Sequence, residues 1–309
     1  MLTGLRVSKE LIHRADDREI LVSPPWRDPD GTYGNATVTD DLSTYYRDHP
    51  RTHWADLLLL TEACRQAALS VTHHFEGLPR DIAFFFNSIA VEIPDIQALV
   101  DVRREMTITT LIERMRLRGD GSPKQLLYTQ LGSLGPGELT VRTVMAVQGA
   151  PKDRYQELRR YERDGSAPPT TASLRDRMRH QDGLSAPTTV GRTQPTNVVL
   201  ADLRIGPERS SATLAPDFAN PSLFDHDYDH YPAMVLIEAG RQLALAGTQA
   251  PSHWVATGVR AEFVHFAELD RTATVSARRH GHRTEVECSQ HDVTVARMSF
   301  DLQSIGVAA

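Results

Sequence analysis

The alternation of apolar and polar positions predicts one succession of elements that occurs twice along the chain. Residues 60–69 (LTEACRQAAL) and 236–245 (LIEAGRQLAL) match at seven of ten positions. The shared residues are mostly strong helix formers and their flanks are almost wholly apolar, which is typical of a buried helix. We therefore expect two long buried helices, over 56–75 and 232–247.

Short runs rich in β-branched and aromatic residues, several with period-two alternation, surround each predicted helix. We expect strands after the first helix at 83–93, 104–118, 125–134 and 138–148, and after the second at 253–267, 271–280, 283–289 and 292–303. Earlier strands are expected at 197–205 and 209–215, and residues 5–22 predict a strand hairpin. Each half is thus predicted to contain a long helix and an antiparallel meander.

A buried helix wrapped by an antiparallel sheet is the hotdog arrangement, so the repeat predicts an α+β tandem hotdog fold. Two copies in one chain would form an internal pseudo-dimer whose sheets join edge to edge, which hides the edges that one copy leaves open. The expected domains are an N-terminal hotdog at 1–150, a linker at 151–195 and a C-terminal hotdog at 196–309. The linker is rich in Arg, Asp, Pro and Ser, and its charged part at 153–163 predicts an exposed helix.

Composition agrees with two ordinary domains. The chain has 309 residues, 40% of them hydrophobic and 24% charged, as in soluble globular proteins. A net charge of −6 argues against nucleic acid as a partner. The N-terminus lacks the apolar core of a signal peptide and no apolar run approaches a membrane span, so a cytoplasmic location is expected. Cys64 and Cys288 have no metal or disulfide spacing and are interpreted as core residues.

Each predicted helix carries polar residues that an apolar environment does not tolerate unpaired. A Glu, an Arg and a Gln share one helical face in both copies, namely Glu62, Arg65 and Gln66 in the first and Glu238, Arg241 and Gln242 in the second. Buried charges are either paired or take part in chemistry. Two interpretations stay open: a buried Glu–Arg pair that fixes the helix, or a group that binds substrate or exchanges a proton.

Histidine and aspartate are dense just before the second helix. His226 and His230 lie four residues apart, with Asp225, Asp227 and Asp229 around them. The first half has a looser set before its helix, consisting of Asp48, His49, His53 and Asp56. A metal site, a proton-transfer site and a set of caps are all compatible with this pattern. Proton transfer is favoured because a helix N-terminus offers N–H groups for an oxyanion, while no His/Cys cluster completes a metal shell.

Several stretches in both halves resemble the A-factor synthase (AfsA-like) family, tandem hotdog proteins that begin the synthesis of γ-butyrolactone, butenolide and furan signals in filamentous bacteria. The stretches that carry the resemblance are 11–14 (LIHR), 19–22 (EILV), 56–67, 220–226, 229–242 and 259–270. The series around the second helix is also similar to hotdog hydratases and dehydratases that act on acyl-carrier-protein thioesters. One departure is Ala233, where the family usually has glycine and where an extra methyl group narrows the approach of a substrate carbonyl.

The resemblance implies an acyltransferase that moves a β-ketoacyl group from acyl carrier protein to a hydroxyl of dihydroxyacetone phosphate. Thioester transfer needs a base and an oxyanion hole, so no cofactor or metal is expected beyond the phosphopantetheine of the carrier protein. The catalytic candidates are His230, His226, Asp229, Glu238 and Glu62. The substrate-binding candidates are Arg241, Gln242, Arg65, Gln66, Ala233, Met234 and Arg260.

Each candidate has a chemical reason. A histidine oriented by its neighbouring aspartate would take the hydroxyl proton, and a glutamate with a pKa raised by burial would be the partner acid or base. The amides of Ala233 and Met234 would hold the oxyanion, and an arginine would bind the phosphate. We expect the second half to carry the working site. A docking patch for the acidic carrier protein is expected at Arg154, Arg159, Arg160 and Arg163.

Two other functions remain compatible with the sequence. The same His and Glu residues could serve a dehydratase or thioesterase on acyl thioesters, which would show no dependence on a phosphorylated triose. Alternatively, the chain is a non-catalytic acyl-binding protein in which the Glu and Arg form only a structural pair. In each case we expect neither nucleic acid nor membrane as a partner, and a monomer with internal pseudo-symmetry or a homodimer.

Overall fold

A computed structural model describes residues 5–51, 56–100, 105–135, 138–175 and 183–305. The chain folds into two compact units. Unit 1 comprises Met1–Ser43 and Leu59–Pro168, and unit 2 comprises Thr44–Leu58 and Pro169–Ala309. The domain boundaries given by the sequence stay a prediction. In the described parts of the chain, no helix is long and apolar enough to cross a membrane.

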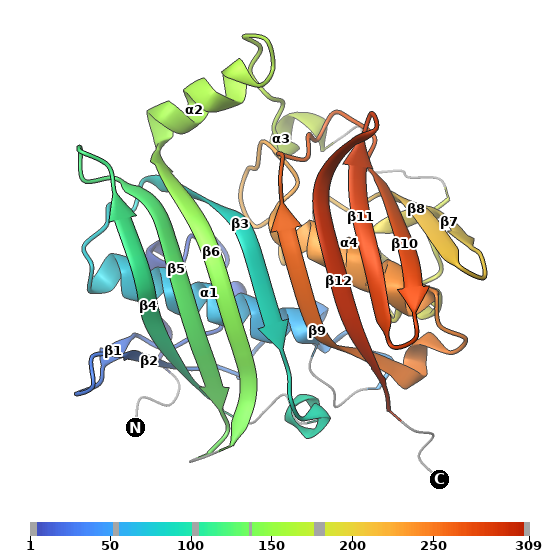
Figure 1. The fold of residues 1–309 in the computed structure, drawn as a ribbon, viewed down its shortest axis with the longest axis horizontal. Coiled ribbons are helices and arrows are strands. Elements are labelled where there is room, and N and C mark those ends of the chain that lie inside the picture. Colours follow the sequence, from blue (N-terminus) through green and yellow to red (C-terminus); the bar gives the residue numbers. More distant parts are fainter. Residues whose placement is uncertain (1–4, 52–55, 101–104, 136–137, 176–182, 306–309) are drawn as a thin grey trace. The chain divides into compact units, whose positions relative to one another are not determined.

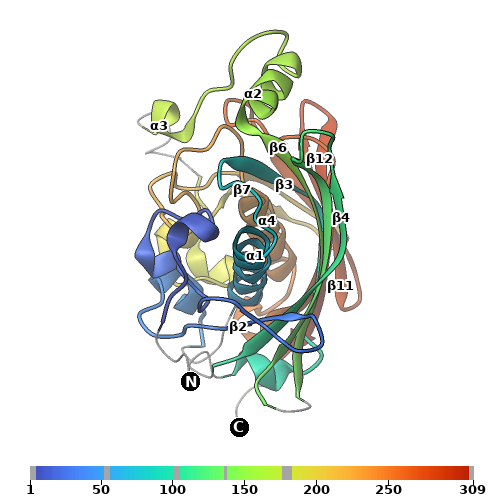
Figure 2. The ribbon, with the colours of Figure 1, turned by 90° about the vertical axis from the view of Figure 1, so that its left-hand side faces the viewer.

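Unit 1 is a curved antiparallel sheet that wraps one long helix (Figures 1 and 2). Helix α1 (Leu57–His74) belongs to this unit from Leu59 onward. The strands lie in the order β1-β2-β4-β5-β6-β3. Their bounds are Trp26–Arg27 for β1, Tyr33–Ala36 for β2, Ile82–Glu92 for β3, Thr107–Leu117 for β4, Pro123–Ser133 for β5 and Leu139–Pro151 for β6. A further helix, α2 (Lys152–Tyr161), follows β6 directly.

Polar contacts join α1 to the concave face of this sheet. On β5, the side chain of Gln130 donates to the carbonyl oxygen of Cys64 over 2.9 Å. The hydroxyl oxygens of Tyr128 and Thr72 lie 2.7 Å apart. All four residues are buried, so α1 is the core of unit 1.

Unit 2 repeats the arrangement around helix α4 (Ala233–Ala246), which packs on strands β9 to β12. Its strand order is β9-β12-β11-β10-β8-β7, and α3 (Thr171–Leu174) is a short helix that precedes the sheet in sequence. The bounds are Leu200–Ile205 for β7, Arg209–Leu214 for β8, Trp254–Phe263 for β9, Thr274–His280 for β10, Arg283–Gln290 for β11 and Val293–Ser304 for β12. At Gly240 the helix approaches the sheet closely, because an added Cβ would lie 2.6 Å from Cε2 of Phe300.

The predicted helices and the strands that follow them are confirmed to within a few residues. The predicted hairpin at 5–22 is wrong, because the described part of this segment forms two short 3-10 helices, Lys9–Leu11 and Asp17–Glu19. Most of its apolar residues, such as Val7 and Ile12, are buried, and the N–H of Val7 donates to the carbonyl oxygen of Val22 over 3.0 Å. Other backbone groups of the segment bond to side chains. For example, the N–H of Leu21 donates to Gln66 over 2.8 Å. The apolar pattern therefore predicted correctly that the segment is largely buried, but it did not predict its secondary structure.

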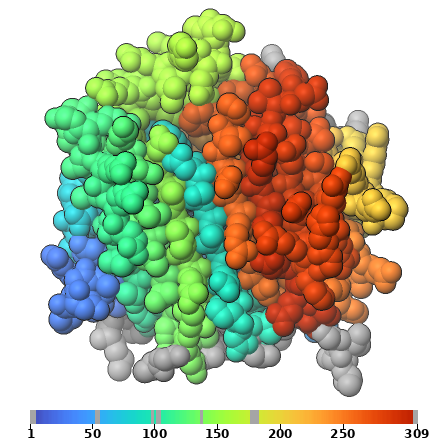
Figure 3. All heavy atoms as spheres, viewed as in Figure 1, coloured from blue at the N-terminus to red at the C-terminus, as the bar shows by residue number. Residues whose placement is uncertain are grey.

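The outer face of β4, β5 and β6 lies at the surface of unit 1 (Figure 3) and carries the exposed Leu111, Leu131 and Val144.

The expected basic patch on the α2 segment is only partly present. Arg159 is buried and lies 3.4 Å from Glu162, so it cannot contribute to a surface patch. Arg154 is exposed but pairs with Asp120 at 3.4 Å.

Candidate active site

The centre of the polar cluster in unit 2 is Glu238, which is fully buried on helix α4. One turn later, Arg241 donates through Nε to Oε2 over 2.7 Å and through Nη2 to Oε1 over 2.8 Å. Gln242 adds a third donor at 2.5 Å. The i, i+3 and i+4 spacing therefore brings all three side chains together, as the repeat predicted.

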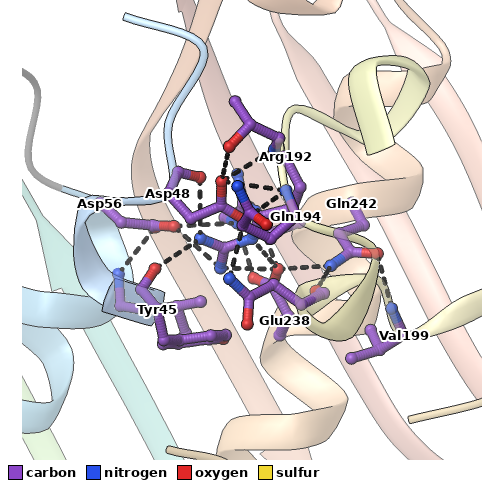
Figure 4. A network of polar contacts seen from close by, with 12 residues as sticks. Tyr45, Asp48, Asp56, Arg192, Gln194, Val199, Glu238 and Gln242 are labelled. Carbon is purple, nitrogen blue, oxygen red and sulfur yellow. Dashed lines mark hydrogen bonds and ion pairs between the residues drawn. The ribbon is translucent and has the colours of Figure 1, made fainter. Parts of the chain in front are cut away.

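Arg192 completes the cluster (Figure 4). The sequence did not predict this residue as part of the site, because it lies in the predicted linker. Its Nε and Nη2 lie 2.8 and 2.7 Å from Oε1 of Glu238. Its Nη1 donates to the carbonyl oxygens of Tyr45 and Asp48, and its guanidinium lies 4.4 Å from the ring of Tyr45. Arg192 is thus a fully buried cation that joins two distant segments to the helix.

A second carboxylate, Asp56, balances the second arginine. Its Oδ2 lies 3.1 Å from Nη2 of Arg192 and 3.6 Å from Nε of Arg241. Burial disfavours the Asp56 carboxylate, but Arg241 and Arg192 hold its pKa below the usual range. Glu238, Asp56 and the two arginines therefore form a charge-balanced buried group.

Asp48 fixes the loop that carries Arg192. Its carboxylate accepts hydrogen bonds from the N–H and hydroxyl groups of Thr193, from the N–H of Gln194 and from the side chain of Asn197. Because Asp48 and Asp56 precede α1 and yet belong to unit 2, the looser His/Asp set of the first half contributes to the second-half cluster. Of that set, His53 lies outside the described residues.

Unit 1 contains a closely similar cluster around Glu62. Arg14 donates to Glu62 from 48 residues upstream, with Nε at 3.0 Å and Nη2 at 2.8 Å. Arg65 binds the same carboxylate through Nε and Nη2 at 2.8 and 2.7 Å, and Gln66 at 2.7 Å. Both halves thus place two arginines and one glutamine on one buried glutamate.

The expected rise of the Glu62 pKa is wrong. Burial alone would raise the pKa, but Arg14 and Arg65 overcome it and lower the pKa of Glu62 to about 2. Glu62 is therefore a permanent carboxylate near neutral pH. In both units, the glutamate is a hydrogen-bonded anchor for two guanidinium groups.

The glutamines also hold the upstream segment on the helix. Gln66 accepts from the N–H of Leu21 over 2.8 Å and donates to the carbonyl oxygen of Glu19 over 2.7 Å. The same two bonds, at 3.0 and 2.7 Å, are formed in unit 2 by Gln242 with Val199 and Asn197. Each glutamine is therefore fully engaged with the chain itself.

The histidines before α4 lie in a partly open loop. Nδ1 of His230 lies 2.6 Å from Oδ1 of Asp229, and Nδ1 of His226 lies 2.8 Å from Oδ1 of Asp225. The side chain of His230 is 23% exposed and that of His226 is 43% exposed. The predicted His–Asp pairs are formed, and His230 is the better enclosed of the two.

Helix α3 holds this loop in place. Asp227 accepts from the hydroxyl of Thr171 over 2.9 Å and from the N–H of Ala172 over 2.7 Å. The backbone N–H of Thr171 donates to the carbonyl oxygen of Tyr228, and the N–H of Tyr228 donates back to the Thr171 hydroxyl. Part of the predicted linker is therefore a support for the histidine loop.

The remaining candidates occupy different settings. Ala233 and Met234 form the partly buried first turn of α4, where N–H groups have no intrahelical acceptor. Arg260 is exposed on β9 and pairs with Asp301 at 3.3 Å. Nδ1 of His49 accepts from the N–H of Arg51 over 3.1 Å. The described residues contain no group of three or more His, Cys, Asp or Glu side chains placed to hold a metal ion.

Two hotdog units, each with a buried Glu–Arg–Gln helix, define a tandem hotdog protein. The chain belongs to the AfsA family, the A-factor biosynthesis hotdog domain, whose profile matches residues 3–145 and 180–305. It is 28% identical over 277 residues to a 2-oxo-3-(phosphooxy)propyl 3-oxoalkanoate synthase of Streptomyces virginiae, covering 88% of this chain and 86% of that protein. A protein of the same name from Streptomyces coelicolor is 28% identical over 286 residues, covering 89% and 82% of the two chains.

The fold is also similar to a solved structure, a variant of the PpsC dehydratase domain from Mycobacterium tuberculosis. The TM-score is 0.52 at 14% sequence identity, and the match covers 94% of this chain and all of that domain. The tandem hotdog prediction is confirmed.

Proposed function

We propose that the chain is an acyltransferase that moves a 3-oxoacyl group from an acyl-carrier-protein thioester to a hydroxyl of dihydroxyacetone phosphate. The observation that carries this proposal is the match of both halves to the family, together with similarity over 88% of the chain to a synthase whose name describes that ester. The substrates would be the acylated carrier protein and the triose phosphate. The ester would be the starting compound for a γ-butyrolactone-type signal.

The reaction needs one proton carrier and one oxyanion site. The triose hydroxyl attacks the thioester carbonyl carbon, its proton passes to a base, and the tetrahedral oxyanion collapses to expel the carrier thiolate, which takes the proton back. Each bond that breaks is matched by one that forms. No cofactor enters this sequence.

The His230–Asp229 pair is suited to carry the proton. With its Nδ1–H donated to Asp229 over 2.6 Å, the imidazole has Nε2 as its basic nitrogen. The pair lies immediately before α4, whose first-turn N–H groups at Ala233 and Met234 suit the oxyanion. His226, with its more exposed ring, would have a secondary role in this loop.

The Glu238 cluster would have a structural role, in which it holds other elements of the site in position. Arg192, Arg241 and Gln242 already bind both oxygens of Glu238, so a direct contact of this side chain with substrate would require buried bonds to break. We assign Glu238, Arg241 and Gln242 to the framework that holds α4 and the Arg192 loop. The triose phosphate still requires a cation, and the exposed Arg260 remains a candidate in this unit.

The test is to incubate the protein with a 3-oxoacyl carrier protein, with and without dihydroxyacetone phosphate, and to identify the products by mass spectrometry. The expected product is the phosphorylated 3-oxoacyl ester, with release of free carrier thiol. Unphosphorylated dihydroxyacetone is the matched control and should react far more slowly. Hydrolysis of the thioester at a rate indifferent to the triose phosphate would overturn the proposal in favour of a thioesterase.

Arg241→Lys provides a second measurement. If Arg241 only anchors Glu238, the variant should lower the melting temperature and reduce transfer and slow hydrolysis together, because lysine loses the two-pronged geometry. If Arg241 contacts the phosphate, transfer alone should fall while hydrolysis persists.

A further inference from the structure

Two histidine rings of unit 1 meet through the same nitrogen, and the proposed acyl transfer uses neither ring. Nε2 of His13 lies 3.0 Å from Nε2 of His73, and the ring centres are 5.0 Å apart. His13 directly precedes Arg14 of the Glu62 cluster, and His73 lies in the last turn of α1. His73 is buried and His13 is half-buried. The two nitrogens therefore form a defined pair within one unit.

The backbone determines the tautomer of His73. Its Nδ1 lies 2.9 Å from the carbonyl oxygen of Leu78, which can only accept a hydrogen bond. Nδ1 must therefore carry the proton of the neutral ring, and Nε2 presents its lone pair to His13, which donates its own Nε2–H. A backbone carbonyl on the far nitrogen is also the usual outer contact of a metal-bound histidine, because it fixes the tautomer and the ring orientation.

The backbone at His13 favours glycine. Its φ is 54°, in the left-handed region that costs a residue with a side chain on the order of 1 kcal/mol. In unit 2, the residue before Arg192 is Gly191, with a φ of 71°. The second copy thus builds the same turn before its arginine without a side chain. The turn alone therefore does not account for the imidazole of His13.

The chain on both sides of His13 is held in place. The carbonyl oxygen of Ile12 accepts from Arg65 over 3.2 Å, and Arg14 donates to Glu62. His73 is fixed by its helix and by the bond to its far nitrogen. Two ligands that are positioned before an ion arrives lose little conformational entropy when it binds. The pair is therefore pre-organised.

The separation of the two nitrogens suits a single transition-metal ion. Imidazole nitrogens bind such ions at about 2.0–2.1 Å, so two of them lie about 2.9 Å apart at a right angle and about 3.3 Å apart at a tetrahedral angle. The observed 3.0 Å is closer to neighbouring positions of a tetragonal site, which Cu²⁺ and Ni²⁺ prefer, than to the tetrahedral site of Zn²⁺. Burial lowers the pKa of His73, which keeps this ring neutral and able to bind a metal near neutral pH.

We propose that His13 and His73 bind one Cu²⁺ or Ni²⁺ ion through their Nε2 atoms. The ion takes the place of the Nε2 proton of His13, which passes to Nδ1 of the same ring or to water. Because the described residues form no group of three or more His, Cys, Asp or Glu ligands, water molecules fill the remaining positions. Arg80 is the charged residue that acts on His73, and its exposure lets solvent screen its repulsion of the ion. This site does not depend on the proposed function.

The test adds one equivalent of CuCl₂ to the metal-free full chain and follows binding by calorimetry and by EPR, which resolves coupling to bound nitrogens. His13→Gly introduces the residue that unit 2 has in this position. His13→Asn also tolerates left-handed backbone but has no imidazole. His73→Gln removes the other ligand, and His74→Gln, at the exposed end of α1, is the matched control. A metal-free thermal melt of each variant checks its fold.

We expect one bound Cu²⁺ with two imidazole nitrogens, and a melting temperature that rises more with Cu²⁺ or Ni²⁺ than with Zn²⁺. Each variant of His13 or His73 should weaken binding by at least about 10–100-fold, the effect of removing even an outer-shell partner. His74→Gln should bind as the unmutated protein does. Equal binding by the unmutated protein and a folded His13 variant, coupling to a single nitrogen, or tighter binding of Zn²⁺ than of Ni²⁺ would overturn the inference. Either His13 variant is sufficient for this comparison.

Discussion

Arg192 binds Glu238 through the same two nitrogens that Arg14 uses on Glu62. The distances from Nε and Nη2 are 2.8 and 2.7 Å in unit 2, and 3.0 and 2.8 Å in unit 1. The arginine precedes its glutamate by 46 residues in one unit and by 48 in the other. The internal repeat therefore extends beyond the two helices to the segment that each helix anchors.

Replacing Arg192 should strongly destabilise unit 2. Arg192→Ala leaves Asp56 and Glu238 with one arginine between them and removes the bonds to Tyr45 and Asp48. We expect the free energy of unfolding to fall by roughly 3–5 kcal/mol, the usual effect of breaking a buried ion pair. Urea unfolding measures this change, with Arg14→Ala as the matched variant in unit 1. A loss below about 1 kcal/mol, the range of a surface ion pair, would show that the network is not structural.

His230 should matter more to turnover than His226. His230→Ala should lower kcat by ~10²-fold or more, the usual effect of losing a general acid or base. His226→Ala should have a smaller effect because its ring is more exposed and stacks on Tyr228 at 4.0 Å. Steady-state assays with thermal melts test both. The reverse ranking, with both variants folded, would assign the proton carrier to His226.

Asp227 should position the histidine loop without touching substrate. Asp227→Ala removes both hydrogen bonds to α3, and we expect kcat to fall several-fold with little change in melting temperature, since these bonds lie at the surface. Asp217→Ala is the control, because Asp217 accepts only the N–H of Ala219 among the side-chain hydrogen bonds described. Equal activity of the two variants would mean that α3 does not support the site.

Stability should fall in mild acid because His49 is buried in its neutral form. Above its ordinary pKa of 6.5, neither the folded nor the unfolded state holds the extra proton. Below 6.5 the unfolded state binds it, whereas the folded state resists until about pH 4. The full contribution of this ring is on the order of 3 kcal/mol, and burial of His73 acts in the same direction.

The measurement is urea unfolding between pH 5 and 7.5, where Glu62 stays ionised in both states. Glu62 also makes stability fall as the pH falls, although it is an acid rather than a base. Its contribution to the free energy of unfolding is complete above its ordinary pKa of 4.5 and is lost as pH falls toward about 2. His49→Asn should flatten the slope between pH 5 and 6.5. An unaltered slope would show that His49 is not the titrating group.

The sequence predicted the helices and most strands because burial on one face imposes a period that can be read directly. It predicted the Glu–Arg–Gln face for the same reason. Arg192 was missed because its surroundings have the composition of a linker, although the signal exists. In both copies, the arginine is followed five residues later by the residue whose carbonyl oxygen binds the glutamine, Glu19 or Asn197.

The charge state of Glu62 could not be predicted from the sequence in the same way. Sequence indicates that Glu62 is buried, but the sign of its pKa shift depends on the arginines that approach it, and Arg14 comes from a segment that was predicted to be a strand. The role of Asp227 was equally hidden, because its partners Thr171 and Ala172 lie far upstream.

The membership of residues 44–58 in unit 2 has a consequence for where the coding sequence can be divided. Asp56, Asp48 and Tyr45 are encoded before the first hotdog helix, yet they complete the charge balance of Glu238 and Arg192. A gene fragment encoding 196–309 would lack all of them, and Arg192 as well. The charge balance of the second helix therefore depends on residues encoded ahead of the first one, so a cut at 195 would divide a single network.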